Sequence, residues 1–292
     1  MLNMLIEPLQ YQFMQHALFT GLVVSLVCAL LSCFLVLKGW ALMGDAISHA
    51  VLPGVVIAYC LSIPLLIGAF ISGFSCALLT GYIKQRSRIK EDTVMGVVFS
   101  SMFALGLVLF TQVETDQHLM HVLFGNILGI SKNLMLQTIT ICSVVLLCTL
   151  WFRKDLKLYC FDKSHARVVG LNTNFLYYLL LVLMAMTTVA AIQVVGIVLV
   201  VAMLVGPGVI ALILSKRFEQ MLIIACLVAS CSTFMGVLIS YHIDGSTSAC
   251  IVLFQALVFI CAFSYKSLYN KGKRRAAKLA SQPKTVLSST QP

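Results

Sequence analysis

The chain has 292 residues, of which 60% are hydrophobic and only 10% are charged, and its formal net charge is +10. Soluble domains carry about a quarter charged residues, so this composition excludes an ordinary soluble protein and indicates a chain embedded in lipid. The Lys and Arg residues lie in short clusters between apolar runs, as in the cytoplasmic loops of membrane proteins, which argues against nucleic acid as a partner.

Apolar runs long enough to cross a bilayer recur along nearly the whole chain. A transmembrane helix needs about 20 mostly apolar residues, and continuous rather than alternating runs favour helices over a closed barrel. We therefore predict an all-α, polytopic transmembrane helical bundle. The candidate spans are 16–36, 39–61, 64–83, 94–112, 133–152, 174–191, 194–214, 220–240 and 248–266. The sixth and seventh leave little room for a turn and also fit one bent helix or a re-entrant hairpin, so eight to nine spans are expected.

The basic clusters predict the orientation of this bundle. They fall at 84–90, 153–167, 216–217 and 266–278, on one side of the predicted membrane, whereas 112–131 contains no Lys or Arg. Because cytoplasmic loops are rich in Lys and Arg, we expect the N-terminus outside and the C-terminus in the cytoplasm.

The same patterns divide the chain into three parts. Residues 1–15 are expected to be an interfacial lead-in, and 16–266 form the transmembrane domain. Residues 267–292 are polar and basic, which predicts a disordered cytoplasmic tail that touches anionic membrane lipid.

The second predicted span contains two side chains of the kind that bind metals. Asp45 and His49 interrupt the apolar stretch WALMGDAISHAVLPGVVIAY. An aspartate at the centre of a membrane helix costs about 2.5–3.5 kcal/mol, so we expect it to face a polar interior or a partner. A spacing of four residues places both side chains on one helix face, where one oxygen and one nitrogen suit Mn²⁺, Fe²⁺ or Zn²⁺.

Two ligands hold a metal weakly, and a two-fold dimer with this helix at its axis would provide two Asp and two His. The alternative is structural, with Asp45 capping the helix and His49 packed in the core. Pro53 and Gly54 follow in the same span and predict a loosened or kinked helix. Pro207, between two glycines, predicts a second break, and both a packing kink and direct metal contact stay open there.

The basic segment after the fifth span ends in FDKSHARVVGL, which predicts a short helix. Asp162 is a suitable N-cap and Gly170 a suitable C-terminal stop. Their spacing places Asp162, Ala166 and Gly170 along one side, where small residues let another surface approach closely. An ordinary amphipathic loop helix would also fit this pattern.

The expected outer segment contains several acidic and imidazole side chains that could handle arriving metal. Exposed loops also collect such residues without function, and both interpretations stay open. The residues are Glu114, Asp116, His118 and His121.

Other functional classes lack their signatures. The sequence has no G-x-x-x-x-G-K-[ST] phosphate loop, so we expect no enzyme activity here and ATP hydrolysis by a separate chain. An ion-coupled secondary transporter can also use an intramembrane Asp and His, but no inverted repeat is detectable. An intramembrane metalloenzyme ranks last, because the sequence has no HExxH motif.

Five segments, in the same order, resemble the permeases of metal-specific ABC importers. GDAISHAVLPG is similar to the second-helix motif of that family. The other four are EDTVMGVVFSSMFALG, LFGNILGIS, FDKSHARVVGL and VVGIVLVVAMLVGPGVIA, so the resemblance covers about residues 14–265.

The resemblance implies a permease subunit of an ATP-driven, binding-protein-dependent importer in the bacterial plasma (inner) membrane. Asp45 and His49 would coordinate the transported metal, and Asp162, Ala166 and Gly170 would lie in the coupling helix. The implied partners are cytoplasmic ATPase subunits, an extracytoplasmic metal-binding protein, and a second copy of the permease or a sister permease. No permanently bound cofactor is implied. The residue at position 53 favours manganese or iron as cargo, with zinc as the alternative.

Overall fold

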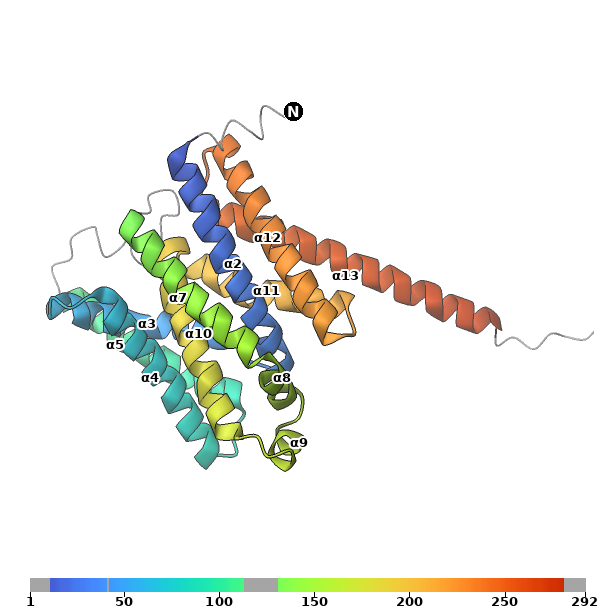
Figure 1. The fold of residues 1–292 in the computed structure, drawn as a ribbon, viewed down its shortest axis with the longest axis horizontal. Helices are drawn as coiled ribbons and strands as arrows, with labels where there is room; N and C mark the ends of the chain where they lie inside the picture. Colours follow the sequence, from blue (N-terminus) through green and yellow to red (C-terminus); the bar gives the residue numbers. More distant parts are fainter. Residues whose placement is uncertain (1–10, 41, 113–130, 281–292) are drawn as a thin grey trace, which may run out of the picture.

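The computed structural model describes residues 11–40, 42–112 and 131–280, and it contains helices but no strand in these ranges (Figure 1). Nine helices of the described chain are long and apolar enough to cross a membrane. They are α2 (Gln12–Lys38), α3 (Met43–Cys60), α4 (Leu65–Arg86), α5 (Glu91–Gln112), α7 (Lys132–Trp151), α10 (Thr173–Val195), α11 (Ile197–Leu214), α12 (Phe218–Ile243) and α13 (Thr247–Ala280). Two short helices, α8 (Arg153–Phe161) and α9 (Lys163–Val168), lie between α7 and α10. The predicted all-α, multi-pass bundle is therefore confirmed.

The ambiguous sixth and seventh spans are two separate helices joined by one residue. Gly196 separates α10 from α11, with φ 79° and ψ 165°. Only glycine adopts this backbone region readily, because a Cβ atom would clash with the backbone. The turn thus lies three residues beyond the predicted gap at 192–193 and gives nine candidate spans in the described ranges rather than eight.

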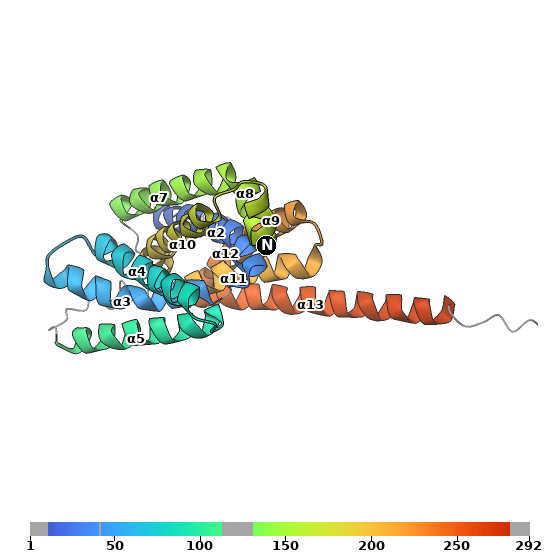
Figure 2. The ribbon, with the colours of Figure 1, turned by 90° about the horizontal axis from the view of Figure 1, so that it is seen from below.

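Helices α2, α3 and α10 form the interior of the bundle, whereas α5, α7 and α13 lie at its edge. Figure 2 shows α5 and α13 on one side and α7 on the other. α2 packs against α7, α11 and α12, and α3 packs mainly against α4 and α5. The second predicted span is therefore buried by neighbours on most of its surface, which is the setting that two polar side chains require.

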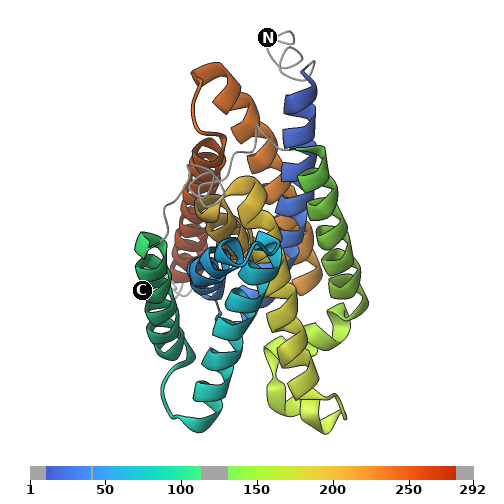
Figure 3. The same ribbon diagram turned by 90° about the vertical axis from the view of Figure 1, so that its left-hand side faces the viewer.

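The basic connections gather at one end of the bundle. Figure 3 shows the α4–α5 connection and α9 at the end opposite the N-terminal start of α2. The Glu219 carboxylate of α12 lies 3.6 Å from an Arg153 guanidinium nitrogen and 3.9 Å from the Lys157 ammonium of α8. This places the α11–α12 turn at the same end as α8 and α9.

The last helix is longer than the sequence analysis predicted. α13 continues to Ala280, so the expected disorder from residue 267 is wrong for 267–280, and 281–292 lie outside the described residues. The physical reason is that Lys, Arg, Ala and Leu are good helix formers, and extending an existing helix avoids the cost of nucleation. At the other end α2 begins at Gln12, so part of the expected lead-in is helical, and 1–10 are likewise outside the described residues.

Candidate functional site

Asp45 and His49 contact each other on one face of α3. The Asp45 Oδ1 atom lies 3.3 Å from the His49 Nε2 atom, one helical turn away. The helix N-cap is Leu42, which makes no side-chain capping bond, and Asp45 lies inside the first turn. The geometry therefore favours a carboxylate–imidazole pair over the capping alternative.

Two aromatic rings of α5 hold the His49 imidazole in place. The Phe99 ring is stacked on it, with centroids 6.0 Å apart, and the Phe103 ring meets it edge-on at 5.1 Å. The His49 Nδ1 atom is buried and has no hydrogen-bond partner among the described residues. A neutral imidazole with its proton on Nε2 thus keeps an unused lone pair on Nδ1.

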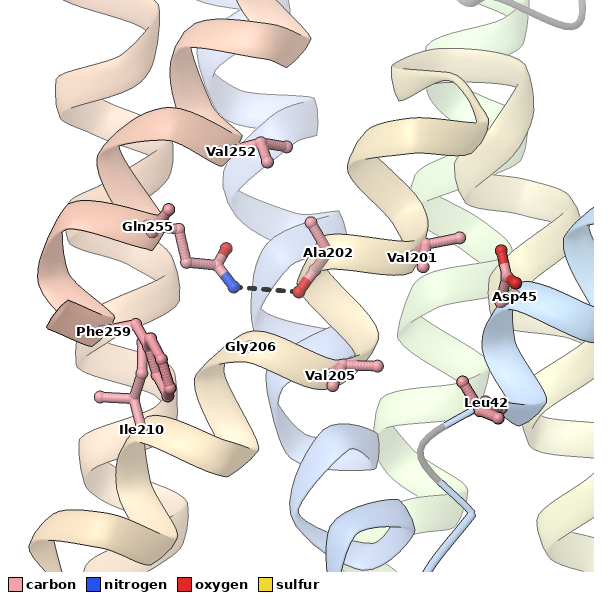
Figure 4. Close-up of a pocket in the computed structure, with 11 residues that line it drawn as sticks. Leu42, Asp45, Val201, Ala202, Val205, Gly206, Ile210, Val252, Gln255 and Phe259 are labelled. Carbon is pink, nitrogen blue, oxygen red and sulfur yellow. Dashed lines mark hydrogen bonds between the residues drawn. The ribbon is translucent and has the colours of Figure 1, made fainter. Parts of the chain in front are cut away.

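Asp45 borders a cavity of about 490 Å³ formed by α3, α11 and α13 (Figure 4). In Figure 4 Asp45 lies on the α3 side and Gln255 on the α13 side, with α11 passing between them. The rest of the lining is apolar. About a third of each side chain of the pair stays exposed, 34% for Asp45 and 32% for His49. A carboxylate within a membrane span cannot remain against lipid at low cost, so this face needs a polar setting, such as a water-filled cavity or a covering partner.

The pair is incomplete as a metal site within the described part of one chain. No three His, Cys, Asp or Glu side chains of the described residues lie close enough to hold a metal ion together. First-row divalent ions in closed protein sites take four or more ligands, so one copy supplies at most part of a coordination sphere. The predicted outer cluster of Glu114, Asp116, His118 and His121 lies outside the described residues.

Pro53 and Gly54 lie where α3 touches its neighbours, and α3 continues through them to Cys60. A Cβ atom on Gly54 would overlap the backbone carbonyl of Gly68, so the two helices are in direct backbone contact there. Pro53 fits against Gly106 of α5, where an added Cβ would come within 2.8 Å of the proline ring. These residues therefore allow close packing of α3, α4 and α5 beside the Asp45–His49 pair.

Pro207 lies inside α11, and both neighbouring helices supply hydrogen bonds around it. The Ser32 hydroxyl of α2 accepts a bond from the Gly208 N–H at 2.7 Å. The Gln255 Nε2 amide of α13 donates to the Ala202 carbonyl at 2.9 Å (Figure 4), in space that a side chain on Gly206 would fill. Pro207 is not among the residues that line the cavity. This arrangement favours a packing kink over direct metal contact.

The segment predicted to couple to an ATPase forms α9, with the expected caps. The Asp162 carboxylate accepts bonds from the N–H groups of His165 (3.1 Å) and Ser164 (2.8 Å), which hold the pKa of Asp162 below its ordinary value. Gly170, at φ 89°, ends the turn in the left-handed region.

Of the three predicted coupling residues, Asp162 and Gly170 are exposed and Ala166 is buried. Ala166 is completely buried by the described chain itself, whereas Val168 is 85% exposed and Val169 58% exposed. Val168 and Val169 are thus the apolar part of a segment that is otherwise exposed, and the methyl group of Ala166 faces inward.

A family model described as the ABC 3 transport family matches residues 10–266. The chain belongs to the ABC 3 transport family. The resemblance inferred from the sequence motifs is thereby confirmed.

Several named proteins are similar to this ABC 3 family chain. A "probable iron transport system membrane protein" of Haemophilus influenzae is 56% identical over 268 residues, 92% of this chain and 99% of its own length. The "manganese transport system membrane protein MntB" of Synechocystis is 50% identical over 258 residues, 88% of this chain and 84% of its own length. Among solved structures, PsaBC from Streptococcus pneumoniae in complex with Fab matches with TM-score 0.81 and 38% identity, covering 90% of this chain and 95% of that one.

Sequence reasoning missed three residues around the site of this ABC 3 family member. Phe99 and Phe103 stand four residues apart in the motif EDTVMGVVFSSMFALG, so their shared helix face was readable from the sequence. Their contact with His49 was not readable, because it depends on how α5 packs against α3. Gln255 gave a weaker signal, the single polar residue in the apolar run 249–263.

Proposed function

We propose that this chain is the permease subunit of an ATP-driven, binding-protein-dependent importer of divalent metal ions, iron or manganese, in the bacterial plasma membrane. The observation that carries the proposal is the carboxylate–imidazole pair of Asp45 and His49 at 3.3 Å, within a membrane span and beside a cavity. The named iron and manganese transport proteins among the relatives support the choice of metal. Zinc is the alternative cargo.

In this proposal a metal ion released by an extracytoplasmic binding protein is received by Asp45 and His49. The Asp45 anion offsets part of the charge of the ion, which loses hydration when it enters a span. The neutral imidazole supplies a nitrogen ligand of the kind that first-row metals bind well. Phe99 and Phe103 keep the ring oriented, so little freedom of the ring is lost on binding.

A second permease, either another copy of this chain or a sister chain, completes the coordination in this proposal. Each copy supplies two ligands, and a pair of copies supplies four. The partly exposed side chains of Asp45 and His49 and the open cavity beside them mark the face that it would cover.

The proposal assigns energy input to separate ATPase subunits that contact α9 at the basic end of the bundle, which faces the cytoplasm. Asp162 caps that helix, Gly170 ends it, and the exposed Val168 and Val169 offer an apolar contact surface. The orientation predicts that a cysteine replacing the exposed Arg88 is labelled only from the cytoplasm, and one replacing the exposed Ser246 only from outside. Opposite labelling would remove the ATPase assignment.

The test is uptake of radiolabelled manganese, iron and zinc by cells that contain the ATPase and the binding protein. We expect Asp45→Asn and His49→Ala to reduce uptake at least tenfold while the amount of protein in the membrane stays normal. Parental uptake by both variants would show that the pair is structural. Uptake that persists with an inactivated ATPase would instead support an ion-coupled transporter.

A further inference from the structure

A cation–aromatic contact between the half-buried Lys38 and two buried rings joins the end of α2 to α8. The Lys38 Nζ atom lies 4.1 Å from the centre of the Tyr159 ring and 6.0 Å from the centre of the Trp40 ring. Tyr159 is 1% exposed and Trp40 is 2% exposed. An ammonium group above an aromatic face is attracted by the ring quadrupole, and the attraction grows when water is excluded. We call Lys38, Trp40 and Tyr159 the aromatic clamp.

The aromatic clamp reaches the first turn of α3. The backbone N–H of Trp40 donates to the Leu35 carbonyl at 2.9 Å and so closes the end of α2. The backbone carbonyl of Trp40 accepts from the Met43 N–H at 3.0 Å. Met43 is the first residue of α3, and Asp45 lies in the same turn. The Trp40 ring also meets Tyr177 of α10 edge-on at 5.4 Å. Trp40 is thus bonded to both helices that it connects and fixed from the side by a third.

The other end of the aromatic clamp belongs to the segment that carries α9. Tyr159 is in α8, and the Asp162 N–H, which follows α8, donates to the Leu158 carbonyl at 3.0 Å. Asp162 then caps α9, so no free loop separates the two short helices. Because Asp162 alone joins the two helices, a translation of α9 also displaces the end of α8, which carries the Tyr159 ring.

We propose that Lys38, Trp40 and Tyr159 are positioning residues that link the segment α8–α9 to the Asp45-bearing turn of α3. The inference rests on the function proposed above, because it assumes that an ATPase acts on α9. Close-packed interiors transmit displacements because they have little free volume to absorb them. The alternative is that the aromatic clamp only stabilises the fold. The two alternatives predict different results when the aromatic clamp is weakened. If the aromatic clamp links the two segments, metal transport falls while ATP hydrolysis continues. If it only stabilises the fold, transport and hydrolysis change together.

The test uses the complete transporter, with ATPase and binding protein, in vesicles, and compares metal transported with ATP hydrolysed. Lys38→Met removes the charge and keeps a long apolar chain, and Lys38→Arg keeps the charge. Tyr159→Leu removes the ring, and Tyr159→Phe keeps it. We expect Lys38→Met and Tyr159→Leu to assemble and hydrolyse ATP but to transport at least fivefold less metal per ATP. Lys38→Arg and Tyr159→Phe should stay within twofold of the parent.

Three results would overturn the inference. The first is a parental transport ratio in Lys38→Met and Tyr159→Leu. The second is an equal loss in the conservative variants, and the third is a parallel fall of hydrolysis and transport. Should Tyr159→Leu fail to assemble, the two Lys38 variants decide the question alone. A parent that imports no metal would contradict the proposed function, whereas a parent that imports metal together with unaffected variants would contradict only the role of the aromatic clamp.

Discussion

Gly54 of α3 and Gly68 of α4 bring the two helix backbones into direct contact, because a Cβ atom on either residue would overlap the carbonyl of the other. The contact lies one turn beyond His49 on the same helix. The tightest helix pair of the site therefore depends on two residues that have no side chain.

We expect Gly68→Ala to destabilise the protein by about 1–3 kcal/mol, the usual cost of inserting a methyl group into a packed interior. A matched control is Gly96→Ala in α5, where no atom lies within 4 Å of the added methyl. That change should be neutral or stabilising, because alanine favours a helix over glycine by about 1 kcal/mol. Thermal unfolding in detergent measures the stability of both variants. Equal melting temperatures for Gly68→Ala and Gly96→Ala would contradict the contact.

The Phe103 ring should assist metal transport by holding the His49 imidazole in its orientation. Removing it in Phe103→Ala frees the imidazole to rotate, and an aromatic pair of this kind is worth about 0.5–1.5 kcal/mol. We expect the metal concentration for half-maximal uptake to rise about two- to tenfold. Leu105→Ala, at an exposed position of the same helix, is the control. The idea fails if both variants behave alike.

The exposed face of α9 should bind the ATPase. Val168→Asp introduces a carboxylate at a position that is 85% exposed, so the fold should tolerate it. Burying that charge in an interface should weaken co-purification of the ATPase by about tenfold. Ile243→Asp makes the same change at an exposed position at the other end of the bundle and should leave the complex intact. Normal recovery of the ATPase with Val168→Asp would exclude this face.

Asp162 should make the cap of α9 sensitive to strong acid. The backbone N–H groups of His165 and Ser164 favour the ionised carboxylate, so the folded-state pKa lies below the ordinary value of 3.8. The stabilisation is complete above that value and is lost as the pH falls through the lower folded-state pKa.

Amide hydrogen exchange at Ser164 and His165, corrected for the intrinsic effect of pH, measures this loss. Asp162→Asn keeps a capping oxygen without the charge and should give protection that does not change between pH 6 and pH 2. The same acid-induced loss in Asp162→Asn would assign the effect to another group.

The features that sequence reasoning predicted correctly are local ones. Apolar runs identified the spans, and the hydrogen bonds of Asp162 to residues two and three positions ahead followed from its place before a short helix. The inward position of Ala166 could not be predicted, since spacing within α9 does not reveal which side α8 and α10 cover. Likewise, hydropathy marked a break between the sixth and seventh spans but not that Gly196 alone makes it. Helix 267–280 was missed because composition alone does not show that an adjoining helix can extend into it.

Gly196 is the only residue between α10 and α11, so no flexible loop separates the two helices. A loop of several residues can absorb a shift of one helix through many small rotations, but here only the φ and ψ of one residue are available. The two helices therefore cannot slide past each other independently. Their relative motion is confined to pivoting about this one residue, and a shift at the end of α10 displaces the start of α11, the helix that lines the cavity beside Asp45.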